Sequence, residues 1–144
     1  MTGLNELRDA AYRNAVEHGW WDEVRHRESG GGILMERGFA EVIALIHSEA
    51  SEALEGWRDG YATGYTYFTD GGVHKDHHVP EDASMGLVWV TEYGWKPEGV
   101  PSEFADIIIR VLDACGAYGI DIDEAVRLKM EFNRTRPFKN GRAV

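Results

Sequence analysis

The chain of 144 residues carries a formal net charge of −10, with 43% hydrophobic and 28% charged residues, which is typical of one soluble domain with a hydrophobic core. This acidic balance argues against a nucleic-acid polymer as partner, because phosphate backbones require a basic surface, but it allows a free nucleotide held through cations. No apolar run approaches the ~20 residues that span a bilayer, no secretory signal opens the chain, and Cys115 is the only cysteine, so we expect a cytoplasmic protein without disulfides or a membrane partner.

We predict a first helix over about residues 3–18 and a glycine-rich loop through residues 30–32. A second helix is predicted over about residues 34–58, with Gly60 as its C-cap. Residues 59–100 are rich in glycine and aromatic side chains, which indicates a long insertion. Within it, we expect residues 86–93 to form a short strand that pairs with residues 65–68 as a β-hairpin.

The third helix is predicted to begin at Pro101 and to run to about residue 116, because proline is favoured in the first turn of a helix. A fourth helix is predicted from Asp121, which precedes Glu124 by the spacing of a capping box, to about residue 135, where Pro137 stops it. The expected fold class is therefore all-α: a single domain over residues 1–144 with a four-helix core and an insertion at 59–100.

Two glutamates of the second helix lie on or beside its apolar face. At ~100° per residue the apolar side chains form one broad arc, with Glu49 inside it and Glu52 at its edge, whereas Glu55 points away and receives no role. An ionised glutamate on a buried face is costly unless it is paired or bound to a cation. Glu49 is therefore predicted to bind a cation, to pair with an internal arginine or to lie at a subunit contact.

The third helix is apolar over most of its circumference, so we expect it to be nearly surrounded by protein. Its remaining strip carries the charged residues Glu103, Asp106, Arg110 and Asp113. Glu103 and Asp106 share a helix face, as Glu49 and Glu52 do, because each pair is three residues apart. If the two pairs face each other, they form a cage of four carboxylates that favours Mg²⁺, with Mn²⁺ as a substitute. An acidic face in contact with solvent is the alternative.

The fourth helix supplies positive charge. Lys129 and Asn133 are four residues apart within its apolar arc and are predicted to face inward, either for an internal salt bridge or to hold a phosphate oxygen. Arg136 follows in a basic end of the chain. Aromatic side chains can stack on bases, although most of those in a small domain belong to its core. Trp57, one turn beyond the glutamates of the second helix, is the residue assigned to the substrate, and the insertion adds further candidates: Tyr61, Tyr65, Tyr67, Phe68, Trp89, Tyr93 and Trp95.

Three segments carry a resemblance: Ile46-His-Ser-Glu-Ala-Ser-Glu-Ala-Leu54, Lys96-Pro-Glu-Gly-Val-Pro-Ser-Glu-Phe-Ala-Asp-Ile-Ile-Ile-Arg-Val-Leu-Asp113, and Lys129-Met-Glu-Phe-Asn133 with Arg136-Pro137. In this order they resemble the MazG-like members of the all-α nucleoside triphosphate pyrophosphohydrolase superfamily. That family has two adjacent glutamates and a third three residues on, followed by Glu-x-x-Asp and a late Lys and Asn. Ser48 stands where many members have the first glutamate. This difference removes one metal contact of the family pattern and bears on the number of metal ions bound.

The resemblance implies hydrolysis of a nucleoside triphosphate, such as a deoxynucleoside or modified nucleoside triphosphate, to the monophosphate and pyrophosphate. The residues it implies are Glu49, Glu52, Glu103 and Asp106 for Mg²⁺, Lys129, Asn133 and Arg136 for the phosphates, and Glu49, Glu52 and Lys129 for catalysis. Relatives form dimers or tetramers, so a homodimer or homotetramer is expected.

Three alternatives remain open. The first is a dUTPase-type or dCTPase-type member of the same superfamily. The second is a non-catalytic helical protein that binds metal or nucleotide and regulates a partner, which the serine at position 48 favours. The third is a zinc site at His74, His77 and His78, although no convincing further ligands lie near them in the sequence.

Overall fold

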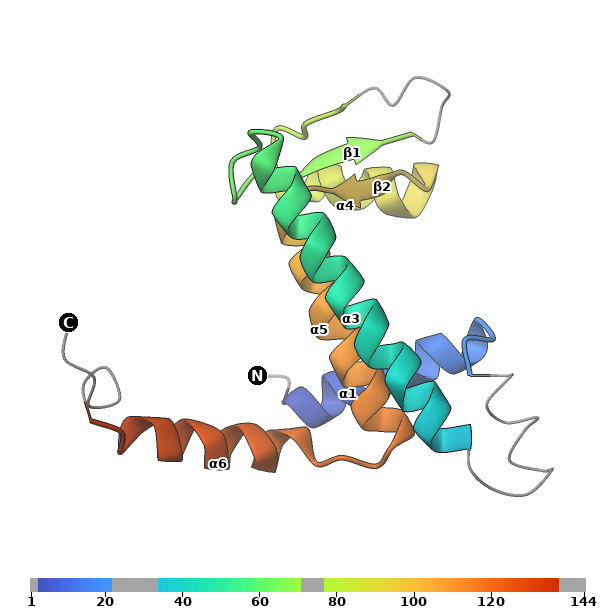
Figure 1. Ribbon diagram of the computed structural model, residues 1–144. Helices are drawn as coiled ribbons and strands as arrows, with labels where there is room; N and C mark the ends of the chain where they lie inside the picture. The colour runs from blue at the N-terminus through green and yellow to red at the C-terminus, as the bar shows by residue number, and fades with distance from the viewer. Residues whose placement is uncertain (1–2, 22–33, 71–76, 138–144) are drawn as a thin grey trace. The chain divides into compact units, whose positions relative to one another are not determined.

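The computed structural model describes residues 3–21, 34–70 and 77–137. For residues 34–37 it describes the backbone alone. Within these ranges the protein is mostly helical, as expected, with one small sheet. The elements are α1 (Leu4–Glu17), α3 (Leu34–Arg58), β1 (Tyr67–Thr69), α4 (Ala83–Tyr93), β2 (Lys96–Glu98), α5 (Val100–Ala117) and α6 (Ile122–Arg134) (Figure 1). The predicted glycine-rich loop at residues 30–32 lies outside the described residues.

The chain forms two compact units: unit 1 comprises residues 1–36 and 111–144, and unit 2 comprises residues 37–110. The four predicted helices correspond to α1, α3, α5 and α6 and have nearly the predicted bounds. The four-helix core of the MazG-like type and the single domain over 1–144 stay predictions. None of the described helices is long and apolar enough to cross a membrane.

In unit 1, the first turns of α1 and α6 cap each other. The carboxylate of Asp123 accepts hydrogen bonds from the backbone N–H groups of Leu4 and Asn5, at 2.9 and 3.1 Å. The Asn5 side chain in turn accepts a backbone hydrogen bond from the first turn of α6. Asp121 caps α6 by accepting from the N–H of Glu124, as its spacing predicted. These side chains satisfy backbone donors that helix starts otherwise leave unpaired.

The end of α5 packs against α1 in unit 1. The buried Trp21 indole donates a hydrogen bond of 2.7 Å to Asp113, and its ring lies 6.1 Å from both Tyr12 and Tyr118. Gly116 permits this contact, because a Cβ atom at this position would lie 2.4 Å from the Cβ of Tyr12. Asp113, which the sequence placed on the charged strip of the helix, therefore contributes to the packing of unit 1.

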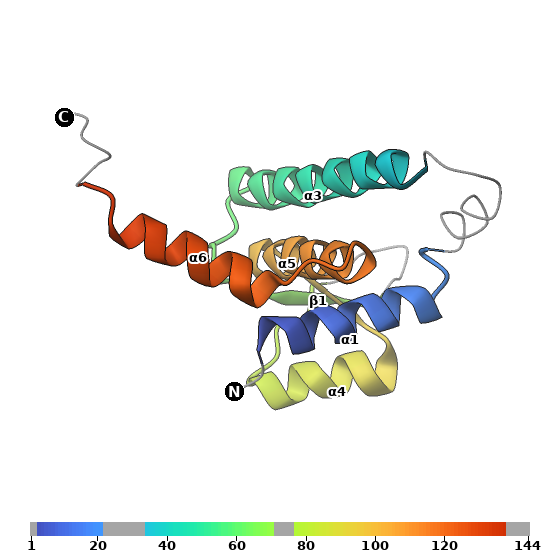
Figure 2. The same cartoon turned by 90° about the horizontal axis from the view of Figure 1, so that it is seen from below.

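In unit 2, α3 and the first part of α5 lie side by side and antiparallel (Figures 1 and 2). Near the end of α3, the Cβ position of Gly56 is 3.8 Å from Val100 at the start of α5. Further back along α3, Glu49 contacts Arg110, which lies further forward along α5. This antiparallel pairing places residues 49–56 of α3 beside residues 100–110 of α5.

The strands β1 and β2 form an antiparallel two-stranded sheet in which Tyr67 is opposite Glu98 and Thr69 is opposite Lys96. Because side chains alternate along a strand, these four residues share one face of the sheet, and Phe68 lies on the other. That other face packs on α4, where the Cβ position of Gly86 is 3.0 Å from the Phe68 ring. The sheet therefore has an apolar face toward α4 and a polar face.

The predicted strand at residues 86–93 is wrong, because these residues belong to α4. The side chain of Asp82 caps the start of this helix by accepting from the N–H groups of Ser84 and Met85, and Gly94 ends it with a left-handed φ of 67°. These two end signals outweigh the β-branched residues between them. A two-stranded sheet is present in the insertion, but the partner of β1 is Lys96–Glu98.

Two predictions of burial are wrong for the single chain. Phe104, Ile108 and Ile109 of α5 are each about half exposed, so this helix is not surrounded by protein. No residue of α6 is buried, so Lys129 and Asn133 do not face inward. Both helices thus keep apolar side chains at the surface of the chain.

Candidate functional site

Three carboxylates converge between α3 and α5 in unit 2. Glu49 of α3 and Glu103 and Asp106 of α5 each have an oxygen atom within 4.8 Å of the others. Glu49 is 7% exposed and Glu103 is 8% exposed, while Asp106 is half-buried. Glu103 and Asp106 share one face of α5, and the antiparallel pairing brings Glu49 opposite them. Among the described residues, this cluster is the group of acidic, histidine or cysteine side chains that could hold a metal ion.

Glu49 also forms an ion pair with Arg110. Two guanidinium nitrogens of Arg110, Nε and Nη2, each lie 2.6 Å from Oε1 of Glu49. The alternative in which Glu49 pairs with an internal arginine is therefore realised, and it coexists with the cluster. A charge-assisted pair of this kind holds the Glu49 carboxylate in a fixed orientation toward α5.

The environment of the cluster disfavours negative charge. Burial, followed by the charge of Glu52, raises the pKa of Glu103 from 4.5 to about 7. Burial, followed by the charge of Glu49, also raises the pKa of Asp106, although Arg110 and Lys96 act in the opposite direction. A bound cation would stabilise the ionised form of carboxyl groups whose pKa is raised in this way.

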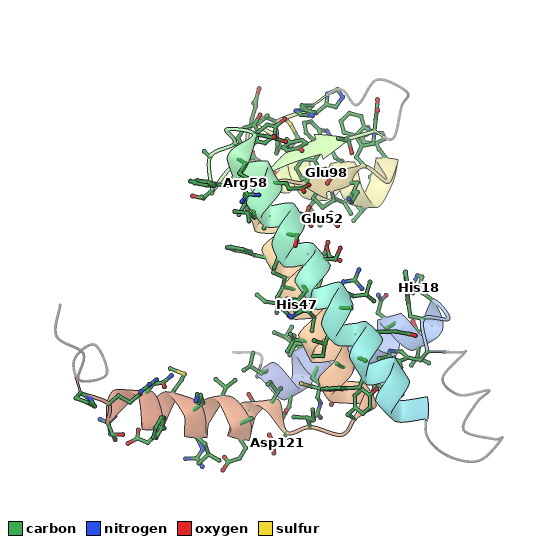
Figure 3. All side chains as sticks on the ribbon, viewed as in Figure 1. His18, His47, Glu52, Arg58, Glu98 and Asp121 are labelled. Carbon is green, nitrogen blue, oxygen red and sulfur yellow. The ribbon has the colours of Figure 1, made fainter. Side chains whose placement is uncertain are left out.

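Glu52, the fourth predicted carboxylate, is exposed and lies outside the group of three. Its charge nevertheless acts on Glu103, so it borders the cluster. Figure 3 labels Glu52 on α3 and Glu98 on β2 among the side chains of unit 2. The predicted cage is thus a core of three carboxylates with a fourth at its solvent side.

The polar face of the sheet adds a cation that the sequence interpretation left without a role. Lys96 of β2 pairs with Glu98 at 3.1 Å and has an exposed side chain. Burial lowers the pKa of Lys96, but the hydrogen bond to Glu98 and the charges of Glu98, Glu103 and Glu52 outweigh it, and the net effect is a raised pKa. Lys96 is therefore within electrostatic reach of the carboxylates. The signal was present in the segment beginning at Lys96, but the strand pairing that orients this residue was not predicted.

The charges around the cluster do not balance. Five carboxylates act on one another there, against two cations. The acidic residues are Glu49, Glu52, Glu98, Glu103 and Asp106, and the cations are Lys96 and Arg110. A formal excess of three negative charges at a partly buried site is costly, and it is relieved either by protonation, as the raised pKa of Glu103 and Asp106 indicates, or by a further cation.

The remaining predicted residues lie elsewhere. Lys129, Asn133 and Arg136 belong to unit 1 and are exposed. The Lys129 ammonium and the Arg136 guanidinium lie 5.3 and 5.7 Å from the centre of the Phe132 ring. Trp57 of unit 2 is 58% exposed near the end of α3. All four side chains are accessible to a ligand.

Of the three histidines of the zinc alternative, His74 lies outside the described residues. The ring of His77 stacks on Tyr67, with 4.1 Å between centroids, and the ring of His78 lies 4.4 Å from Trp95. Within the described ranges, Nε2 of His78 is a buried nitrogen without a hydrogen-bond partner. The two described rings therefore pack against different aromatic neighbours.

Comparison of the chain with protein-family models, with curated proteins and with solved structures found no match.

Proposed function

We propose that this protein is a Mg²⁺-dependent nucleoside triphosphate pyrophosphohydrolase of the MazG-like type. The observation that carries the proposal is the convergence of Glu49, Glu103 and Asp106 within 4.8 Å on two antiparallel helices. These residues are three of the four carboxylates that the family resemblance implies for the metal, and Glu52 is the fourth. The substrate class proposed is a deoxynucleoside or modified nucleoside triphosphate.

The donor set fits magnesium. It consists of carboxylate oxygens, which hard divalent cations prefer, and it carries an excess of negative charge that such an ion would neutralise. Glu49, Glu103 and Asp106 would hold the ion, with Glu52 at the solvent side, and Mn²⁺ is the expected substitute. When bound, Mg²⁺ supplies neutralisation of phosphate charge and polarisation of an attacking water.

The chain's own residues divide the remaining work. Glu52 is exposed, whereas Glu49 is buried and paired with Arg110, so Glu52 is the better general base toward a water molecule. The water oxygen bonds to the α-phosphorus, its proton goes to Glu52, and the bond from the α-phosphorus to the bridging oxygen breaks to release pyrophosphate. Lys96 stabilises charge on the phosphate oxygens, and Arg110 keeps Glu49 in position.

Four further residues are assigned to the substrate, three because of the resemblance and one because it is an exposed aromatic residue. Lys129, Asn133 and Arg136 are assigned to the phosphates, with Lys129 also assisting catalysis, and their support is the resemblance together with their exposure. Trp57 is assigned to the substrate because it is an exposed aromatic residue one turn beyond Glu52.

The test is release of pyrophosphate from a panel of canonical and modified nucleoside triphosphates with Mg²⁺. The natural chain is compared with the double variant Glu52→Gln, Asp106→Asn and with Glu55→Gln, which neutralises an exposed glutamate on the same helix. We expect release that requires Mg²⁺, falls by at least about 100-fold in the double variant and is unchanged in the control. No release from any nucleotide would overturn the proposal. A response confined to dUTP or dCTP would identify the dUTPase-type or dCTPase-type alternative.

A second candidate function is a non-catalytic protein that binds metal or nucleotide and regulates a partner. Ser48 is exposed where the family has a glutamate, and the buried Glu49 pairs with Arg110, so this chain has fewer free carboxylates than the family pattern. Tight nucleotide binding without turnover in the same panel would favour this function.

We also propose that the chain assembles as a homodimer or homotetramer. Apolar side chains are exposed on α3 and on the first part of α5 in unit 2. They are Phe39, Ile43, Leu45, Leu54, Phe104, Ile108 and Ile109. Exposed apolar side chains in this number favour contact with another protein surface, and the resemblance makes a second copy the expected partner.

A further inference from the structure

Aromatic rings gather on both faces of the β1–β2 sheet, but in different ways. On the apolar face, Phe68 is 7% exposed and meets Trp89 edge to face, with 5.4 Å between centroids, as in an ordinary core. On the polar face, the rings of Tyr61, Tyr65, Tyr67 and His77 form what we call the tyrosine stack. This second group lies outside the core of the unit.

The rings of the tyrosine stack contact one another in three stacked and two tilted pairs and remain accessible. Tyr67 and His77 are 4.1 Å apart at 23°, Tyr61 and Tyr67 are 5.3 Å apart at 28°, and Tyr61 and Tyr65 are 6.1 Å apart at 4°. The three tyrosines are half-buried and His77 is exposed. Tyr61 and His77 are tilted by 47°, and Tyr65 and Tyr67 by 32°, so the four rings form a cluster of stacked and tilted pairs. The outward-facing ring surfaces of such a cluster are available to a planar ligand.

The stack lies next to the carboxylate cluster. Tyr67 is opposite Glu98 in the sheet, and a Cβ atom at Gly99 would be 3.7 Å from the Tyr67 ring. The carbonyl of Gly99 accepts a hydrogen bond from the backbone N–H of Glu103, so one helical turn separates this contact from the cluster. Burial, then the charges of Tyr61, Glu98 and Glu103, raise the pKa of Tyr67, which therefore keeps its hydroxyl proton near neutral pH.

We propose that the tyrosine stack binds the base of the nucleoside triphosphate, by stacking the base on its rings while the phosphates lie toward the carboxylate cluster. This inference rests on the proposed function, because the phosphates are placed by the metal-binding carboxylates. A nucleoside triphosphate offers a planar base and a charged triphosphate, and unit 2 holds an aromatic surface for the first and a cation-binding group for the second, joined through Gly99. Stacking does not read the edge of a base, so several bases bind, and purines bind more tightly than pyrimidines because their rings are larger.

The test compares two probes in the presence of Mg²⁺ by calorimetric titration: a non-hydrolysable α,β-methylene analogue of dATP and inorganic tripolyphosphate. The natural chain is expected to bind the nucleotide more tightly than tripolyphosphate. In Tyr67→Leu this advantage falls by about 5- to 100-fold, the range that stacking on one aromatic side chain contributes. Tyr67→Phe retains the advantage, because the ring remains and only the hydroxyl is lost.

The matched control is Tyr93→Leu, which removes an exposed tyrosine of α4 in the same unit. Tyr93 lies 6.0 Å from Trp95 and takes no part in the tyrosine stack, so its loss leaves nucleotide affinity unchanged. Titration of each variant with Mn²⁺ alone shows whether the carboxylate cluster survives the substitution. Equal affinity of the natural chain for the two probes overturns the proposal, as does an equal loss for both probes in Tyr67→Leu.

Failure of this inference and failure of the proposed function give different results. If the natural chain binds the analogue through Tyr67 but releases no pyrophosphate from any substrate, the stack stands and the hydrolase proposal falls. If pyrophosphate is released and KM is the same in Tyr67→Leu as in the natural chain, the hydrolase proposal stands and the stack falls. If the natural chain does not bind the analogue, the stack falls as well.

Discussion

At the scale of single residues, Lys96 and Arg58 offer a direct comparison between two exposed cations of unit 2. Lys96 acts electrostatically on Glu103 and Asp106, whereas Arg58, at the end of α3, is not among the main causes of the pKa shift of either. We expect Lys96→Met to lower kcat/KM for the triphosphate by about 10- to 100-fold, because a charge-assisted contact to a phosphate oxygen contributes about 1.5–3 kcal/mol. Arg58→Met should leave kcat/KM within about twofold of the natural value. Steady-state kinetics with saturating Mg²⁺ measure both, and equal effects would contradict the role given to Lys96.

Glu103 links stability to pH in the metal-free protein. Its pKa is raised from 4.5 to about 7 in the folded chain, so the folded state binds an extra proton between these values. The free energy of unfolding contributed by Glu103 is therefore fully present below about pH 4.5 and is lost as the pH rises through about 7. The charged groups around it are Glu49 and Glu52 of α3, Lys96 of β2 and Asp106 of α5, and the raised pKa of Asp106 acts in the same direction.

Urea unfolding with a chelator between pH 4.5 and 8 measures this dependence. Glu103→Gln removes the titrating group and should flatten the profile relative to the natural chain. Added Mg²⁺ should raise the midpoint of unfolding more at pH 8 than at pH 5.5, because carboxylates must be deprotonated to bind a metal. Coincident profiles for the variant and the natural chain would show that Glu103 does not titrate in this range.

The sequence was sufficient to select Glu49, Glu103 and Asp106, because helix periodicity shows which carboxylates share an apolar or charged face. It was not sufficient to find Lys96. That residue reaches the site only because β2 pairs with β1, and a pairing between residues 67–69 and 96–98 leaves no periodic signal in so short a strand. The inward face assigned to Lys129 assumed a covering partner for α6, and within the described part of the chain no residue of α6 is buried.

At the scale of elements, we expect alanine in place of two helical glycines, Gly116 of α5 and Gly56 of α3, to change stability in opposite directions. A Cβ atom at Gly116 would lie 2.4 Å from Tyr12, so Gly116→Ala forces α1 and α5 apart and should destabilise the protein by about 1–3 kcal/mol. At Gly56 the nearest atom is 3.8 Å away on Val100, an ordinary contact. Gly56→Ala should stabilise by up to about 1 kcal/mol, since alanine favours helices. Chemical denaturation of both variants decides, and a shift in the same direction for both would contradict this account.

The ends of the helices explain which elements the sequence predicted well. Asp121 and Glu124 gave the start of α6 because a capping pair is local in sequence. The same kind of signal was present around α4, where Asp82 precedes the helix and Gly94 ends it. The β-branched residues between them favoured a strand, but the two end signals outweigh them. In the resulting helix Gly86 and Trp89, three residues apart, present one side of α4 to Phe68.

At the scale of the whole molecule, the apolar side chains of α3 and α5 are exposed in the single chain and would be buried in the proposed assembly. Ile108 is 56% exposed on α5, where the sequence predicted burial on nearly every side. A second copy that covers these side chains accounts for both the predicted burial and the observed exposure. In the proposed assembly, the apolar character of α5 reflects an interface between chains rather than the core of one chain.

The assembly prediction can be tested with a charge placed on α5. Light scattering coupled to size-exclusion chromatography should give the mass of a dimer or tetramer for the natural chain. Ile108→Glu should raise the dissociation constant at least about 10-fold, because an unpaired charge would be buried at the interface. Val79→Glu is the matched control, since Val79 is 53% exposed but lies outside both helices, and it should leave the mass unchanged. A monomeric mass for the natural chain at every concentration would contradict the prediction and leave the apolar side chains of α3 and α5 for a different partner.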